Sequence, residues 1–149
     1  MKKVLLGIGN ELLGDDSIGP WIAKKINGKN NWIGINAGTA PENFLSLIKR
    51  EKPDLLVIVD ATEMGLSPGE IRLIPREKIP KLTYFSTHTL SLAFLIETLE
   101  SDVGKILFIG IQPKAIALGC PISEEVVLSA KRLLGILTQE EDLNEITSL

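Results

Sequence analysis

The sequence of 149 residues predicts a three-layer α/β sandwich, in which a twisted, mostly parallel sheet of about five strands has helices on both faces. Two observations support this fold class. Short, continuous apolar runs are typical of parallel strands that are buried on both faces. Segments with apolar residues at helical spacing separate these runs, as right-handed crossovers between parallel strands require. We expect one domain over residues 1–149, with a frayed acidic tail at residues 139–149.

Five segments have the character of strands. They cover residues 3–9, 31–37, 54–60, 69–74 and 105–111. The segment 69–74 differs from the others because Ile71 and Leu73 alternate with polar residues. It also follows the third strand after a short turn, whereas a parallel return would need a longer crossover. This segment is therefore predicted to be an antiparallel edge strand.

Four segments have helical periodicity. They cover residues 16–26, 41–50, 89–99 and 124–137. Pro20 falls in the first turn of the first helix, where a missing N–H group matters least. The segment 89–99 is apolar nearly all round, which predicts a helix that neighbouring elements cover well.

Composition and charge exclude several classes of protein. The 16 basic and 19 acidic residues give a net charge of −3, and no Lys/Arg cluster indicates nucleic-acid binding. No segment approaches the roughly 20 apolar residues of a membrane span. Cys120 is the only cysteine, so an intrachain disulfide and a cysteine-based zinc site are excluded. Because the first apolar segment is also too short for the pattern of a signal peptide, we expect a cytoplasmic protein. We expect a monomer, because no exposed heptad or long apolar patch is evident.

The glycines after the first strand raise the alternative of a nucleotide site. Gly7 and Gly9 match the start of a dinucleotide-binding motif, but Leu12 stands where the third glycine should be. The following loop is acidic and would repel a pyrophosphate. A tight exit from the strand is the competing explanation for both glycines.

Three residues at element ends could carry chemistry. Asp15 and Asp16 precede the first helix; one aspartate suffices as its N-cap, which leaves Asp16 for another role. Asp60 ends an apolar strand, at the edge where ligands bind in α/β sheets. His88, the only histidine, precedes a helix, whose dipole favours the neutral ring that a metal requires.

Together, Asp16, Asp60 and His88 form a mixed oxygen and nitrogen set for a divalent cation. Three protein ligands with open positions are typical of a hydrolytic metal site. Each residue also has a purely structural explanation: a cap, a turn or a packing contact.

Several motifs carry a resemblance to a known family. The opening motif Gly7-Ile-Gly-Asn-Glu-Leu-Leu-Gly-Asp-Asp-Ser-Ile-Gly-Pro20 resembles that of hydrogenase maturation endopeptidases. Val59-Asp-Ala-Thr62 and Thr87-His-Thr-Leu90 resemble the second and third motifs. Three further stretches resemble the branch that processes the hydrogenase of the formate hydrogenlyase type, also called hydrogenase 3. They are residues 38–43, 64–72 and 110–113.

This resemblance implies an α/β fold and an endopeptidase that cuts the C-terminal peptide from a nickel-loaded hydrogenase large-subunit precursor. It implies that Asp16, Asp60 and His88 contact the metal, which is the nickel of the substrate, and that no nucleotide is required. Asn36 stands where many relatives have aspartate. We expect Asn36, Gly38 and Thr39 to contact the substrate; the competing structural explanation is a turn that only starts the helix at Pro41.

Two alternatives remain open at this point. The first is a nucleotide-dependent α/β enzyme that uses the loop from Gly7 to Gly14. The second is a non-catalytic nickel carrier or hydrogenase chaperone, which would bind the precursor without cutting it.

Overall fold

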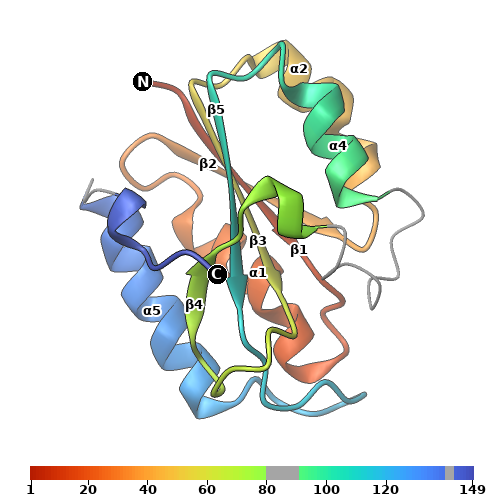
Figure 1. The fold of residues 1–149 in the computed structure, drawn as a ribbon, viewed down its shortest axis with the longest axis vertical. Coiled ribbons are helices and arrows are strands. Elements are labelled where there is room, and N and C mark those ends of the chain that lie inside the picture. Colours follow the sequence, from red (N-terminus) through yellow and green to blue (C-terminus); the bar gives the residue numbers. More distant parts are fainter. Residues whose placement is uncertain (80–90, 140–142) are drawn as a thin grey trace.

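A computed structural model of the chain describes residues 1–79, 91–139 and 143–149. A five-stranded sheet forms its centre, with the strand order β2-β1-β3-β5-β4 (Figure 1). Strands β1, β2, β3 and β5 are parallel, and β4 is antiparallel to β5. The strands are β1 Lys3–Ile8, β2 Trp32–Gly38, β3 Leu55–Ala61, β4 Ile71–Leu73 and β5 Lys105–Ile111. The predicted fold class is thereby confirmed.

Helices pack on both faces of this sheet. Helices α1 and α5 cover one face, and α2 and α4 cover the other (Figure 1). The α-helices are α1 Ile18–Ile26, α2 Leu45–Glu51, α4 Leu92–Leu99 and α5 Glu124–Thr138. The 3-10 helices are η1 Gly14–Ser17, η2 Pro41–Phe44, η3 Arg76–Lys78 and η4 Leu143–Glu145. Among the described helices, none is long and apolar enough to cross a membrane.

The alternation of side chains along the central strands divides the core into two clusters. In β3, Leu56 and Ile58 pack with α2 and α4, whereas Val57 and Val59 pack with α1 and α5. All four side chains are fully buried. Burial of each such side chain contributes about 1.5–3 kcal/mol, so a continuous apolar run is stable only when both faces are covered.

Two glycines bring α1 unusually close to the sheet. A Cβ at Gly7 would lie 2.1 Å from the carbonyl oxygen of Gly19, and a Cβ at Gly19 would lie 2.4 Å from that of Ile8. No side chain fits at either position. The start of α1, and with it η1, is therefore held against the carboxyl end of β1.

The structure corrects three details of the predicted elements. Strand β4 is antiparallel as expected, but its partner is β5, which lies between β4 and β3. Residues 14–17 form a 3-10 turn, so α1 begins at Ile18 rather than Asp16. Helix α4 is not covered all round, because Phe94 is 52% exposed.

The tail expected to fray over residues 139–149 is ordered in its described part, residues 143–149. Leu73 of β4 donates a backbone hydrogen bond to Thr147 (2.9 Å) and accepts one from Leu149 (2.8 Å). Leu73 and Ser148 form a parallel bridge. The acidic composition was misleading because Leu143 and Ile146 still pack against the core on the α5 side of the sheet.

Candidate active site

Asp16 lies in η1, directly beyond the carboxyl end of β1. Its Oδ2 atom accepts a hydrogen bond from the backbone N–H of Asn10 (2.8 Å), and its own N–H donates to the carbonyl of Leu13 (3.0 Å). Gly9 has φ +149°, and a Cβ there would lie 1.8 Å from the carbonyl oxygen of Asp16. Glycine at position 9 therefore allows the turn that carries Asp16 to fold back onto the strand end.

Asp60 lies at the corresponding end of β3, the neighbour of β1. Val59 is in register with Gly7 of β1, and Asp60 is in register with Gly110 of β5. Since η1 also contacts β3, the turn of Asp16 adjoins the strand that carries Asp60. Both aspartates are half-buried, an environment in which a carboxylate can meet both protein donors and a ligand.

The third predicted ligand, His88, lies outside the described residues, as does all of 80–90. Among the residues that the structure describes, no group of three or more His, Cys, Asp or Glu side chains could hold a metal ion. The described part of the predicted set is thus a pair of carboxylates, and the roles of all three residues stay predictions.

Asn36, Gly38 and Thr39 lie at the end of β2, on the other side of β1 from Asp60. The Oδ1 atom of Asn36 accepts a hydrogen bond from Gly38 N–H (3.0 Å), and Gly38 accepts one from Gly9 N–H (2.9 Å). Gly38 has φ +55°, and no atom lies within 4 Å of where its Cβ would be. The space beside Gly38 is therefore open, as a substrate-binding position requires.

Glu11 belongs to this edge, although nothing in its sequence context predicted its contacts. Its carboxylate accepts hydrogen bonds from Lys24 of α1 (3.1 Å) and from the Asn36 side-chain amide. The hydrogen bond from Lys24 and then that from Asn36 lower the pKa of Glu11, against a smaller effect of burial. Asn36 thus has a structural partner, and an aspartate at position 36 would face a carboxylate.

Asp15 is not a cap of the first helix, contrary to one interpretation of the Asp15-Asp16 pair. Its fully buried carboxylate accepts bonds from the backbone N–H groups of Lys114 (2.8 Å), Ala115 (3.0 Å) and Ser123 (2.6 Å), and from the Ser123 hydroxyl (2.9 Å). Burial raises the pKa of Asp15, but these four bonds outweigh that effect and lower it. Asp15 therefore fixes the connection between β5 and α5.

Gln112 has a similar function for the connection after β3. The side chain is 3% exposed, and its Oε1 atom accepts bonds from the N–H groups of Met64 (2.7 Å) and Leu66 (3.2 Å). Its Nε2 atom donates to Glu63 (2.9 Å). The sequence showed only that this glutamine follows a strand; Met64, Leu66 and Glu63 lie 46 to 49 positions away.

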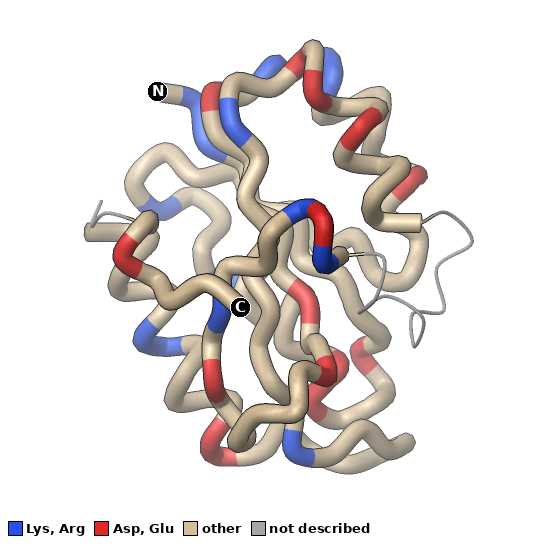
Figure 2. The backbone as a smooth tube through the Cα atoms, in the orientation of Figure 1, with Lys and Arg blue, Asp and Glu red and all other residues tan. Residues whose placement is uncertain are grey.

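Acidic residues gather around the carboxyl edge of the sheet. Figure 2 shows several acidic positions near the lower ends of β3 and β5. The acidic residues of this edge are Glu11, Asp15, Asp16, Asp60 and Glu63. Hydrogen-bond donors surround Asp15, and Lys24 pairs with Glu11.

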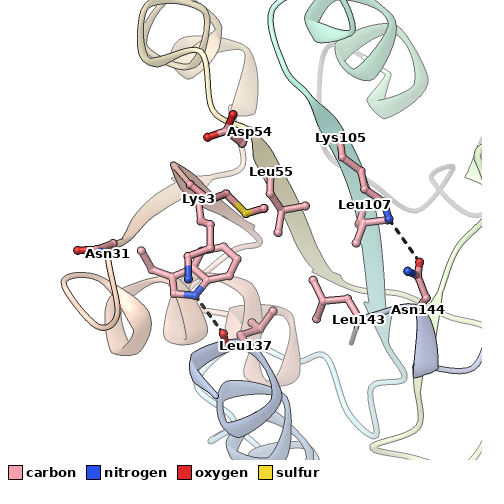
Figure 3. Close-up of a pocket in the computed structure, with 11 residues that line it drawn as sticks. Lys3, Asn31, Asp54, Leu55, Lys105, Leu107, Leu137, Leu143 and Asn144 are labelled. Carbon is pink, nitrogen blue, oxygen red and sulfur yellow. Dashed lines mark hydrogen bonds between the residues drawn. The ribbon is translucent and has the colours of Figure 1, made fainter. Parts of the chain in front are cut away.

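A pocket at the opposite edge of the sheet has a different character (Figure 3). Its volume is about 440 Å³, and its lining includes Lys3, Trp32, Leu55 and Lys105, which are the first residues of their strands. The Lys3 ammonium group lies 5.1 Å from the centre of the Trp32 ring. This pocket is far along the strands from Asp16 and Asp60, so it is separate from the candidate site.

Known proteins match this chain in sequence and in fold. A family model described as hydrogenase maturation protease matches residues 20–140. The hydrogenase 3 maturation protease of Escherichia coli (strain K12) is 42% identical over 128 residues, covering 85% of this chain and 82% of the relative. The solution structure of the endopeptidase HycI from Escherichia coli matches with a TM-score of 0.90 and 38% identity, covering 100% of this chain and 97% of that chain. The NiFe hydrogenase maturation protease HycI from Thermococcus kodakarensis matches with a TM-score of 0.80 and 32% identity, over 93% and 90%.

These matches, on a shared fold, define a hydrolase of the endopeptidase class. The chain belongs to the hydrogenase maturation protease family. The resemblance that the sequence motifs indicated is confirmed.

Proposed function

We propose that the protein is a metal-dependent, cytoplasmic endopeptidase that removes the C-terminal extension of a nickel-loaded hydrogenase large-subunit precursor. The observation that carries this proposal is the placement of Asp16 and Asp60 at the carboxyl ends of adjacent strands, in a chain of this family. In the proposed complex, Asp16, Asp60 and His88 contact the nickel that the substrate brings. Oxygen and nitrogen ligands suit such a cation.

The reaction is hydrolysis of one peptide bond. A water molecule adds to the scissile carbonyl carbon, the water loses a proton, and the amine of the departing peptide gains one. In this proposal Asp16 or Asp60 accepts the proton of the attacking water, because both half-buried carboxylates lie at the sheet edge where the substrate would bind. Asn36, Gly38 and Thr39 contact the substrate backbone beside Asp16.

The alternative of a nucleotide site on the Gly7–Gly14 loop is less favourable. A phosphate would need free backbone N–H groups in this loop. Those of Gly9, Asn10 and Leu12 already donate to Gly38, Asp16 and Asn10, respectively. Close packing against α1 and η1 also explains Gly7 and Gly9 without a ligand.

The test is cleavage of a purified large-subunit precursor, with the masses of both products measured. We expect the nickel-loaded precursor to release its C-terminal peptide and the nickel-free precursor to stay intact. Equal cleavage of both would contradict nickel recognition. Binding of the precursor without any cleavage would favour a chaperone instead.

The variant Asp60→Asn tests the assigned site. Replacement of the carboxylate should lower the cleavage rate at least about 100-fold, because it removes a ligand or the proton acceptor. The matched control is Asp54→Asn, which changes the exposed aspartate just before the other end of the same strand. Asp54→Asn should cut normally. Full activity of folded Asp60→Asn, checked by circular dichroism, would remove Asp60 from the site.

A further inference from the structure

Exposed apolar residues concentrate beside the candidate active site. Six large apolar residues of the described chain are exposed, and three of them lie on two neighbouring loops. Leu12 is 66% exposed on the loop after β1. Ile116 and Leu118 are 48% and 76% exposed on the loop after β5, in the run Ala115-Ile-Ala-Leu118. We refer to Leu12, Ile116 and Leu118 as the apolar platform.

The backbones of the two loops are bonded to each other. Gly119 N–H donates to the carbonyl of Leu12 (3.0 Å), and Asp15 N–H donates to the carbonyl of Ala115 (3.0 Å). Gly14 has φ +53°, and a Cβ there would lie 2.8 Å from the Ala115 carbonyl oxygen. The loops therefore form one continuous surface, although about a hundred residues separate them in sequence.

The buried Asp15 carboxylate holds this surface in a fixed shape. It accepts four hydrogen bonds from Lys114, Ala115 and Ser123, at both ends of the second loop. An unconstrained loop could turn its apolar side chains inward. Here the backbone is bonded on both sides, so Ile116 and Leu118 stay exposed to solvent. Fixed apolar surface in a polar setting is typical of an interaction site.

The apolar platform is continuous with the candidate active site. Asp16 directly follows Asp15, and its N–H donates to Leu13, the residue after Leu12. Its carboxylate accepts from Asn10 N–H, in the same turn. A protein that contacts the platform is thereby brought against the turn that carries Asp16. The occupant must be a protein with an exposed apolar surface next to the segment that reaches Asp16.

We propose that the apolar platform docks the hydrogenase large-subunit precursor, with Leu12, Ile116 and Leu118 in direct contact and Asp15 as the positioning residue of both loops. This inference rests on the proposed function for the identity of the partner. It adds a binding surface outside the metal-contacting residues, on the side of Asp16 that faces the loop after β5.

The test uses the double variant Leu12→Gln/Leu118→Gln with the nickel-loaded precursor. Glutamine keeps the side-chain volume close to that of leucine but removes the apolar contact. We expect KM to rise at least about tenfold with kcat within about twofold, because the chemistry at Asp16 and Asp60 is unchanged. Binding of the precursor, measured by biolayer interferometry, should weaken by the same factor. The control is Leu128→Gln, which changes a 59% exposed leucine of α5 and should leave both values unchanged.

Asp15→Asn provides the second arm. It should also raise KM, and Asp15→Glu should restore KM partly, whereas loss of folding alone would lower the active fraction and hence kcat.

Normal KM and normal binding of the double variant would overturn the proposal. The proposal would also be overturned if sedimentation analysis showed a dimeric wild type and a monomeric double variant. That result would make the platform a contact between copies of this chain. If the wild-type protein binds the precursor through these leucines but does not cut it, the docking surface stands and the proposed function fails.

Discussion

The Asp15 carboxylate accepts four hydrogen bonds from residues far away along the chain. Its partners lie 99 to 108 positions away, and they are backbone groups for the most part. The sequence could therefore not reveal them. Asp16 and Asp60 were predictable, because strand ends of a parallel sheet converge at one edge whatever the long-range details. Glu11 and Gln112 were missed for the same reason as Asp15.

The lowered pKa of Asp15 predicts how stability depends on pH. A carboxyl group whose pKa is lower in the folded state stabilises the fold above its unfolded pKa, and this contribution disappears as pH falls through the folded pKa. Lys114 and Glu125 are charged side chains that interact electrostatically with Asp15. We expect Asp15→Asn to lower the free energy of unfolding by about 2–3 kcal/mol at pH 7.

The measurement is urea denaturation of the wild type and Asp15→Asn between pH 7 and pH 2.5. The difference in the free energy of unfolding between the two proteins should stay constant as pH falls to the unfolded pKa near 3.8, and it should shrink below that pH. The control Asp54→Asn should show a much smaller difference at pH 7. If the loss of unfolding free energy in Asp15→Asn did not depend on pH, the buried position would require the shape of the Asp15 side chain and not its charge.

Gly38 allows the predicted substrate groove to be tested with a matched control. Valine at position 38 strains the backbone by about 1–2 kcal/mol, because φ is +55°. Gly28, in the turn after α1, has φ +85° and equally open surroundings. Gly38→Val and Gly28→Val should lose similar stability, but only Gly38→Val should slow precursor cleavage, by at least about tenfold.

Nickel titration of the same two variants separates substrate contact from metal binding. Both should bind nickel within a few-fold of the wild type, since neither glycine belongs to the metal-contacting set. Gly38→Val and Gly28→Val with equal cleavage rates would show that the end of β2 is an ordinary turn and not a substrate groove.

At the scale of elements, the sequence predicted the four parallel strands to within one or two residues. Continuous apolar runs identify such strands because both of their faces are buried. The position of β4 beside β5 was not predictable, since pairing across a sheet depends on contacts distant in sequence. The sequence also placed the start of α1 two residues too early, at Asp16 instead of Ile18. The close approach of Gly9 and Asp16 requires the tighter 3-10 turn that precedes α1.

The contact between α1 and the sheet should be intolerant of a single methyl group. A Cβ at Gly19 would lie 2.4 Å from Ile8 O and 2.7 Å from Val59 O, and these are backbone atoms that cannot move independently. We expect Gly19→Ala to destabilise the protein by about 3 kcal/mol or more in urea denaturation. Precursor cleavage should fall as well, because η1 and Asp16 would shift with the helix.

Gly135 of α5 is the control for this substitution. No atom lies within 4 Å of its Cβ position, and its backbone is helical. Gly135→Ala should therefore stabilise the protein by about 0.5–1 kcal/mol. If Gly19→Ala lowers the free energy of unfolding and Gly135→Ala raises it, the close contact of α1 with the sheet is the cause of the loss. Equal effects of the two substitutions would contradict this explanation.

At the scale of the whole molecule, the two ends of the sheet have different properties. The carboxyl ends of the strands carry acidic residues (Figure 2), the candidate site and the apolar platform. The amino ends carry the pocket lined by Lys3, Trp32 and Lys105. The rule that ligands bind at carboxyl ends located the candidate site from the sequence, whereas nothing in the sequence indicated the pocket.

The residues that follow η4 have a consequence for behaviour in solution. Strand β4 is an edge strand, and Thr147 and Leu149 occupy the backbone groups of Leu73 that face outward. Lys78 holds the same segment through the carbonyl of Leu149 (2.6 Å). An uncovered edge strand is a template on which another chain can add by β-pairing. Deletion of residues 146–149 should therefore produce a protein that aggregates on storage, measured as a rise in static light scattering. Adding Leu73→Pro to the deletion variant should suppress this aggregation, because proline removes the backbone N–H donor of residue 73.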